Sequence, residues 1–242
     1  MYDIWVVARK EFREQLQRRG EVFRYMWFAI LFGGVLPVAN VINGRQVLII
    51  VSAPWLAYAG VFIASSATLG AFFTERQRGT LESLLATPLP DVAIFVGKVI
   101  FSLFISLVSV AAAVVVEVVM VNLALRISPH LRAGFGGLFF TFPPVFYFAL
   151  LVTLPTILVY TIGIGTLVSL RVDSVRTANL FNILATFLLA VPIGLLTPLV
   201  RIGITWEFLT ALSLVMVVVD VVVLWVAVRC FSRETAVLNV LG

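Results

Sequence analysis

The sequence predicts an all-α integral membrane protein with six transmembrane helices, and two observations support this fold class. First, 62% of the 242 residues are hydrophobic and only 12% are charged, with a mean hydropathy of +1.12. Soluble proteins are typically about 45–50% apolar and about 25% charged, so one water-soluble core could not bury this much apolar surface. Second, the charges leave long uninterrupted apolar runs, such as 46–74 and 133–170.

The spans are read from these runs, because a helix needs roughly 20 apolar residues to cross a bilayer core of about 30 Å. They are predicted at 25–42, 47–73, 99–125, 144–170, 177–200 and 208–231. The run 133–170 exceeds one span, so its residues 134–142 are interpreted as a re-entrant or interfacial lead-in. We expect residues 1–242 to form a single transmembrane domain whose first apolar run is a retained span.

An amphipathic segment precedes the first span. Trp5, Ala8, Phe12 and Leu16 recur at nearly helical spacing, and basic residues share the remaining faces. Such a segment usually lies in the headgroup plane, so 1–20 is predicted to be an interfacial helix, with Gly20 turning the chain into the first span. It could serve only as a topology anchor, or it could flank the docking surface for a partner.

The basic residues set the predicted orientation, because cytoplasmic loops carry the excess of Lys and Arg. With six spans both termini share a side, and thirteen of the 17 basic residues fall there: Arg9, Lys10, Arg13, Arg18, Arg19, Arg24, Arg76, Arg78, Lys98, Arg171, Arg176, Arg229 and Arg233. The other side holds only Arg45, Arg126, Arg132 and Arg201. Both termini and the segment 74–90 are therefore predicted to be cytoplasmic. The net charge of +5 follows from this bias and requires no nucleic-acid partner.

The polar segment 74–90, between the second and third spans, carries the signals of a compact helix. Thr80 can cap the first turn, and Glu82 lies where the helix dipole favours an anion. Its leucines, Leu81, Leu84 and Leu85, are spaced to share one face. The prolines at 88 and 90 end the helix. A short helix held at the membrane surface by two spans is suited to docking a soluble partner.

The sequence shows no catalytic or metal-binding pattern. A single cysteine, Cys230, excludes a disulfide within one chain and any multi-thiolate site, and the single histidine, His130, has no cysteine or carboxylate neighbours. The glycine-rich phosphate loop is absent, since Gly97-Lys98 lacks the earlier glycine and the following Ser or Thr. If this protein uses ATP, we expect another chain to bind it.

Two acidic residues lie inside predicted spans. Glu117 interrupts the third helix and Asp220 lies near the middle of the sixth. A charge at the bilayer centre costs roughly 2.5–3.5 kcal/mol on insertion scales, so each should face protein or water. They could line a substrate path or bind a cation, or they could be protonated or bonded to polar side chains within the bundle, where Asn122, Asn179 and Asn182 are available.

The stretch from Glu75 to Pro88, followed by Gly97-Lys98, resembles the signature of ABC-2 type transporter permeases. In that family the segment between spans two and three is the coupling helix, which contacts the ATPase subunit. The resemblance implies two permease chains, forming a homodimer in the plasma membrane, with two ABC ATPase chains that bind ATP and Mg below them. The residues that it assigns to ATPase coupling are Glu75, Arg76, Arg78, Gly79, Thr80, Leu81, Glu82, Leu84 and Leu85. Unlike larger members, this sequence has no fused ATPase and no large external domain.

Three functional hypotheses follow. The sequence favours the transmembrane permease subunit of an ATP-driven exporter. Two such chains would form the substrate pathway as a dimer and contact membrane lipid. The first alternative is an ion-coupled secondary transporter or channel using Glu117 and Asp220, which would predict repeated halves with broken helices. The second is a membrane scaffold without transport activity. A partner ATPase with nucleotide-binding motifs would favour the first hypothesis.

Overall fold

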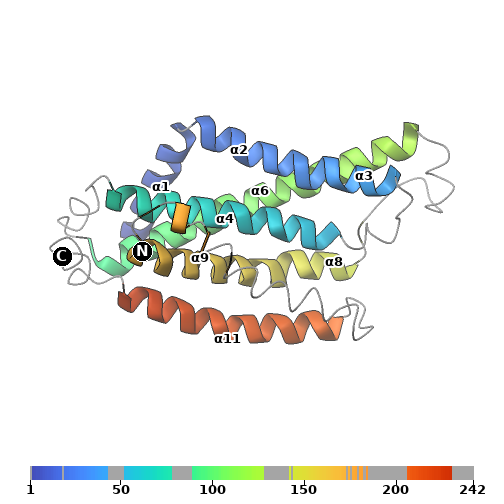
Figure 1. Cartoon of the computed structure of the whole chain (residues 1–242). Coiled ribbons are helices and arrows are strands. Elements are labelled where there is room, and N and C mark those ends of the chain that lie inside the picture. Colours follow the sequence, from blue (N-terminus) through green and yellow to red (C-terminus); the bar gives the residue numbers. More distant parts are fainter. Residues whose placement is uncertain are drawn as a thin grey trace.

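The computed structural model is a bundle of helices lying roughly along one axis (Figure 1). It describes residues 2–17, 19–42, 52–77, 89–127, 142, 144–172, 174, 176–178, 180–181, 184 and 206–230. The N-terminal elements are α1 (Tyr2–Gln17), α2 (Arg19–Ile30), the π-helix η1 (Leu31–Val35) and α3 (Leu36–Ile42). They are followed by α4 (Ser52–Gln77), α6 (Asp91–Ile127), α8 (Pro144–Phe148), the π-helix η3 (Ala149–Thr153), α9 (Leu154–Arg171) and α11 (Trp206–Cys230). Helices are the only regular elements within these residues, which confirms the all-α class.

Five helices of the described part are long and apolar enough to cross a membrane: Gly20–Ala39, Leu56–Phe73, Asp91–Ile127, Pro144–Arg171 and Trp206–Cys230. They coincide in order with the predicted first, second, third, fourth and sixth spans. The predicted fifth span, 177–200, lies almost wholly outside the described residues, as does the lead-in 134–142. The count of six spans therefore stays a prediction.

Two helices begin before the spans that the sequence predicts on them. The third span was expected to begin at 99, but α6 begins at Asp91 and runs for 37 residues. At 1.5 Å per residue it is about 55 Å long, well beyond a hydrocarbon core of about 30 Å. Its first turns therefore reach past the core, and Lys98 lies within a helix rather than in a loop. The first span was expected at 25–42, but helix α2 already begins at Arg19.

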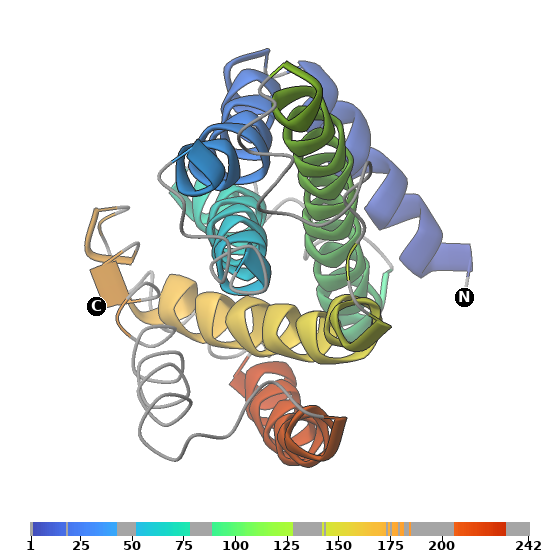
Figure 2. The ribbon, with the colours of Figure 1, turned by 90° about the vertical axis from the view of Figure 1, so that its right-hand side faces the viewer.

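Contacts between elements fix the direction of each helix. α6 runs parallel to α2 and η1, because Phe12, which precedes α2 in α1, packs on Phe104, and Gly33 of η1 packs further along α6 on Ala113. α4 runs antiparallel to α6, since Ala71 lies beside Lys98 and Gly60 beside Val110. The antiparallel direction brings the end of α4 next to the start of α6. Figure 2 shows the spans from one end of the bundle, with α9 between α4 and α11.

Helix α11 runs parallel to α9. Thr153 and Ser213 are hydrogen bonded, with a distance of 2.9 Å between their hydroxyl oxygens. Further along both helices in the same direction, Gly163 packs on Val223. The ends of α4, α9 and α11 and the start of α6 consequently lie beside α1, at one end of the bundle (Figure 1). We call this the α1 end. A hydrophobic cluster there combines Val7, Ala71, Phe95 and Ala227 from four of these helices.

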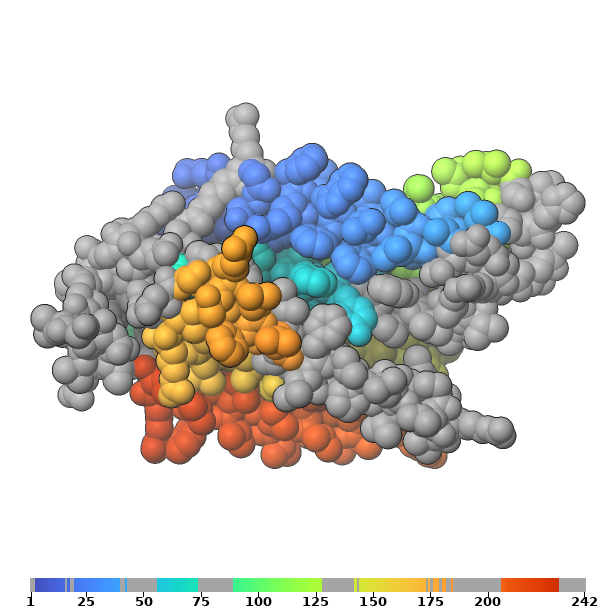
Figure 3. Space-filling view, viewed as in Figure 1, coloured from blue at the N-terminus to red at the C-terminus, as the bar shows by residue number. Residues whose placement is uncertain are grey.

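The outer helices expose apolar side chains. Figure 3 shows α2 and α11 at opposite edges of one face, with α4 visible between them. Phe23 and Trp27 of α2 and Leu214 and Val218 of α11 are all more than half exposed. In water such surfaces would be unfavourable, whereas lipid or a second membrane chain would cover them without cost. The pattern is that of a membrane-embedded bundle.

Both π-helices precede a proline. Leu31–Val35 ends two residues before Pro37, and Ala149–Thr153 ends two residues before Pro155. Proline lacks the N–H that would bond to the carbonyl four residues earlier, and a wider π turn is one way in which a helix accommodates the loss. Each of these two prolines is therefore preceded by a local π turn.

Candidate functional site

The described residues that flank the predicted coupling segment meet at a buried lysine. Lys98 of α6 is fully buried, and its Nζ lies 2.6 Å from Oε1 of Glu11 in α1. The same ammonium donates a hydrogen bond of 2.7 Å to the carbonyl oxygen of Ala71 in α4 and lies 5.5 Å from the centre of the Phe72 ring. One side chain thus joins three helices at the α1 end, directly beside the segment that the sequence assigns to coupling.

The coupling residues themselves are only partly covered by the structure. Glu75 and Arg76 belong to the last turn of α4, so the helix continues into the predicted coupling segment. Their side chains are not described. The remaining coupling residues lie outside the described residues: Arg78, Gly79, Thr80, Leu81, Glu82, Leu84 and Leu85. Their role stays a prediction, but the two helices that hold the segment are well defined.

The two intramembrane acids are buried on different sides of the bundle. Glu117 is fully buried on α6, one helical turn after Ala113 and one before Val121, in the stripe that packs against a core cluster with Ala29 and Leu56. Because its neighbours come from α2 and α4, Glu117 faces the interior of the bundle, as a charge within a span requires.

Asp220 is 6% exposed and faces α9. The register set by Thr153–Ser213 and Gly163–Val223 places it beside Tyr160. Its Oδ1 has no hydrogen-bond partner among the described residues. Of the asparagines proposed as partners, Asn122 instead donates to the Val118 carbonyl at 2.7 Å, and 179 and 182 lie outside the described residues.

These positions do not form a shared ion site. Glu117 lies in the stripe of α6 that packs against Ala29 and Leu56 of α2 and α4, whereas Asp220 of α11 faces α9, so the two acids belong to different helix interfaces. In the part of the chain that the structure describes, no group of three or more His, Cys, Asp or Glu side chains could hold a metal ion. The geometry gives no support to the ion-coupled alternative.

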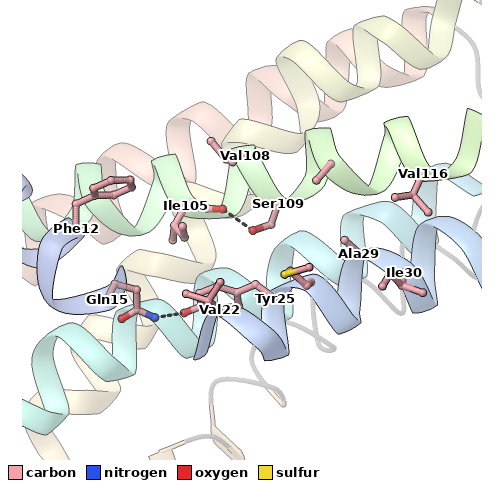
Figure 4. Close-up of a pocket in the computed structure, with 12 residues that line it drawn as sticks. Phe12, Gln15, Val22, Tyr25, Ala29, Ile30, Ile105, Val108, Ser109 and Val116 are labelled. Carbon is pink, nitrogen blue, oxygen red and sulfur yellow. Dashed lines mark hydrogen bonds between the residues drawn. The ribbon is translucent and has the colours of Figure 1, made fainter. Parts of the chain in front are cut away.

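A cavity of about 430 Å³ lies between α1, α2 and α6 (Figure 4). Its walls are mostly apolar, with polar side chains concentrated near the junction of α1 and α2. Gln15 donates a 2.7 Å hydrogen bond from Nε2 to the Tyr25 hydroxyl, and the Ser109 hydroxyl is bonded to the Ile105 carbonyl of its own helix. The lining residues are Phe12, Gln15, Val22, Tyr25, Met26, Ala29, Ile30, Ile105, Val108, Ser109, Ala112 and Val116. Such a space suits an apolar chain with one polar end.

The fold and these positions define a multi-pass helical membrane protein. Its second and third spans form a hairpin, and Lys98 joins the end of α4 to the first turns of α6. The ABC-2 type transporter family matches residues 2–224, which is nearly the whole sequence. The chain therefore belongs to the ABC-2 type transporter family, and the resemblance carried by the Glu75–Pro88 motif is confirmed. No curated protein matches it closely enough to add to this assignment. The chain is thus a transmembrane permease component of an ABC transporter.

Sequence reasoning missed the buried pair. Lys98 was counted among the basic residues of the cytoplasmic side with no partner assigned, and Glu11 was not singled out. A signal for Glu11 exists, because Val7, Glu11 and Gln15 are spaced by four residues and therefore share one face of α1. All three are buried, whereas Trp5 is 65% exposed and Phe12 is 36% exposed. The face of α1 that packs on the protein is therefore the partly polar one.

Proposed function

We propose that this protein is the membrane-spanning subunit of an ATP-driven exporter that works as a dimer and is coupled to a separate ATPase subunit. The observation that carries the proposal is the hairpin of α4 and α6. Its two helices are antiparallel, α4 ends within the predicted coupling segment 74–90 and α6 begins directly after it, and a buried side chain joins the two helices near that segment. A push on the segment between them would be transmitted into both spans.

The proposal assigns ATP and Mg²⁺ to the partner. Phosphoryl transfer depends on a phosphate-binding loop and on residues that hold the metal ion, and this chain contains no such sequence motif. The complex would contain two ATPase chains and two copies of this permease. The apolar faces of α2 and α11 offer area for a second copy and for lipid.

The proposed orientation places the α1 end in the cytoplasm of a cell whose plasma membrane holds the protein. The ends of α4, α9 and α11 and the start of α6 share that end with α1 (Figure 1). Lys98, Arg171 and Arg229 lie there, as the excess of basic residues on the cytoplasmic side requires. The ATPase would then meet the segment 74–90 from the cytoplasm.

The cavity between α2 and α6 supports an amphipathic or lipid-like substrate. From Ile105 to Val116 its α6 wall rises about 16 Å, the scale of an acyl chain rather than of a small ion. The Gln15–Tyr25 pair could receive a polar group at one end. Ions have no comparable set of ligands within the described residues.

Co-purification of the ATPase subunit tests the coupling assignment. Glu82→Arg places the wrong charge at the start of the predicted coupling helix, and Leu84→Ala removes an apolar anchor, where losses of about 1–3 kcal/mol are ordinary for interface hot spots. We expect each change to weaken co-purification or abolish substrate-stimulated hydrolysis while leaving the membrane fold intact. Arg132→Glu, in a predicted outer loop, is the control and should leave assembly unchanged. Variants at 82 and 84 that bind and stimulate the ATPase like the parent would refute the assignment.

A further inference from the structure

We propose that Glu11, Gly97 and Lys98 form a joint that fixes α1 to the hairpin of α4 and α6, so that α1 moves with the coupling segment and carries its motion to α2. This inference rests on the proposed function for the source of the motion. The joint itself is a matter of contacts within this chain. It assigns positioning roles to Glu11, Gly97 and Lys98, of which the family motif flagged only the Gly-Lys pair, without a physical reason.

The ion pair between Glu11 and Lys98 fixes the position of α1 and does more than add stability. Burying two charges costs solvation, and well-packed apolar residues often replace such a pair with no loss of stability. In this structure the Lys98 ammonium lies 2.6 Å from the Glu11 carboxylate and 2.7 Å from the Ala71 carbonyl oxygen. Apolar packing would not supply these two fixed contacts. Both contacts are buried, so water does not weaken them. They set one position of α1 against both helices of the hairpin.

Gly97 allows the close approach that this geometry requires. A Cβ at residue 97 would lie 2.8 Å from the Cβ of Val7 and 3.0 Å from the carbonyl oxygen of Ile4. Real Cβ atoms essentially never come within 2.8 Å of another atom, and the Val7 Cβ is fixed to the α1 backbone, so a side chain at 97 would push α1 away from α6. The Gly-Lys sequence therefore combines a contact that only glycine permits with the lysine that reaches across it.

The same face of α1 is attached at its other end to α2. Gln15 lies one turn beyond Glu11 and donates its 2.7 Å hydrogen bond to Tyr25. The helix α1 thus connects the base of the hairpin to the first span. Tyr25 and Gln15 also line the cavity between α2 and α6 (Figure 4). Motion of the coupling segment would reach Lys98 and Ala71 within about two turns, pass to Glu11, and change the junction at Gln15 that borders the cavity.

The decisive variant removes both charges together. Glu11→Gln with Lys98→Met leaves no uncompensated buried charge, so we expect the double variant to fold. The control is Glu14→Gln, which removes a half-exposed ion pair with Lys10 on the same helix, where the nitrogen–oxygen distance is 3.5 Å. The charge-reversed pair, Glu11→Lys with Lys98→Glu, restores the attraction but reverses the group that faces the Ala71 carbonyl, and should rescue function only in part.

The first measurement needs no ATPase. Spin labels at Arg9, which is exposed on α1, and at Ile127, which is 74% exposed at the far end of α6, report how α1 sits on α6 for the full chain in lipid nanodiscs. We expect one narrow distance distribution in the parent and in Glu14→Gln, and a broad or shifted one in the double-neutral variant. If the double-neutral variant gives a distance distribution with the same width and the same mean as the parent, the proposed joint is wrong.

The second measurement uses the assembled complex with the ATPase subunit. Allosteric couplings typically amount to factors of about 5–150, so loss of the joint should lower the stimulation of ATP hydrolysis by at least about fivefold without preventing ATPase binding. Stimulation at the parent level in a double-neutral variant that folds would overturn the transmitting role. If the parent chain itself neither binds nor stimulates the ATPase, the proposed function fails, whereas the nanodisc distances still decide whether the joint holds α1.

Discussion

The contact between Gly33 and α6 gives the most quantitative prediction about the fold. A Cβ at residue 33 would lie 2.1 Å from the carbonyl oxygen of Ala113 and 2.9 Å from its Cα. Both are backbone atoms, so no side-chain rotation can relieve the overlap, and η1 must separate from α6. Overpacking of this kind typically costs about 1–3 kcal/mol, and occasionally more.

The matched control is Gly70→Ala in α4. A Cβ there meets no heavy atom within 4 Å among the described residues, so alanine adds only its better helix propensity, roughly 0.5–1 kcal/mol. Because Gly33→Ala gains a similar propensity term, the difference between the two variants isolates the packing cost of about 1–3 kcal/mol. For a chain of this size that corresponds to about 2–12 °C in Tm.

Thermal unfolding of the purified variants in the same detergent measures this difference. We expect Gly33→Ala to unfold below the parent and Gly70→Ala at or above it. Equal melting temperatures for the two variants would refute the direct backbone contact between η1 and α6. Such a result would also contradict the parallel packing of α2 on α6 and the cavity between them.

Two further predictions concern α11. Because Asp220 is buried with Oδ1 unpaired in the described part, Asp220→Asn should keep or raise the Tm while changing the rate or the pH dependence of transport, and a marked fall in Tm would instead show a structural role. Cysteines at Thr153 and Ser213, in a Cys230→Ser background, should oxidise to a disulfide and lose maleimide labelling, since the two hydroxyls are 2.9 Å apart. Thr153→Cys with Val217→Cys is the control, and crosslinking there instead would contradict the parallel register of α9 and α11.

The spans were predictable because they follow from one local property. Charge is expensive in hydrocarbon, so the apolar runs had to coincide with helices such as Pro144–Arg171 and Trp206–Cys230. The start of α6 was missed for the same reason. The rule shows where a helix can enter the hydrocarbon core, but it does not show where that helix begins. The turns from Asp91 to Lys98 lie outside that core or are buried within the protein.

The candidate site was predictable only in part. The motif from Glu75 to Pro88 identifies the family, and Gly97-Lys98 belongs to the same resemblance. The partner of Lys98 could not be derived, since Glu11 is 87 positions away and pairing across that separation depends on how α1 packs. Lysines near the end of a span also usually extend their ammonium group to the interface, so a buried one runs against the expected pattern.

Transport by reconstituted vesicles tests the central claim most directly. Sealed vesicles would hold this chain with and without its ATPase subunit, a fluorescent single-chain lipid as reporter, and ATP with Mg²⁺ on the side that carries the α1 end. We predict reporter movement only when both chains and ATP are present, and no ATP hydrolysis by this chain alone. Movement that proceeds without the ATPase subunit and follows an imposed ion gradient would contradict the account and favour the ion-coupled alternative.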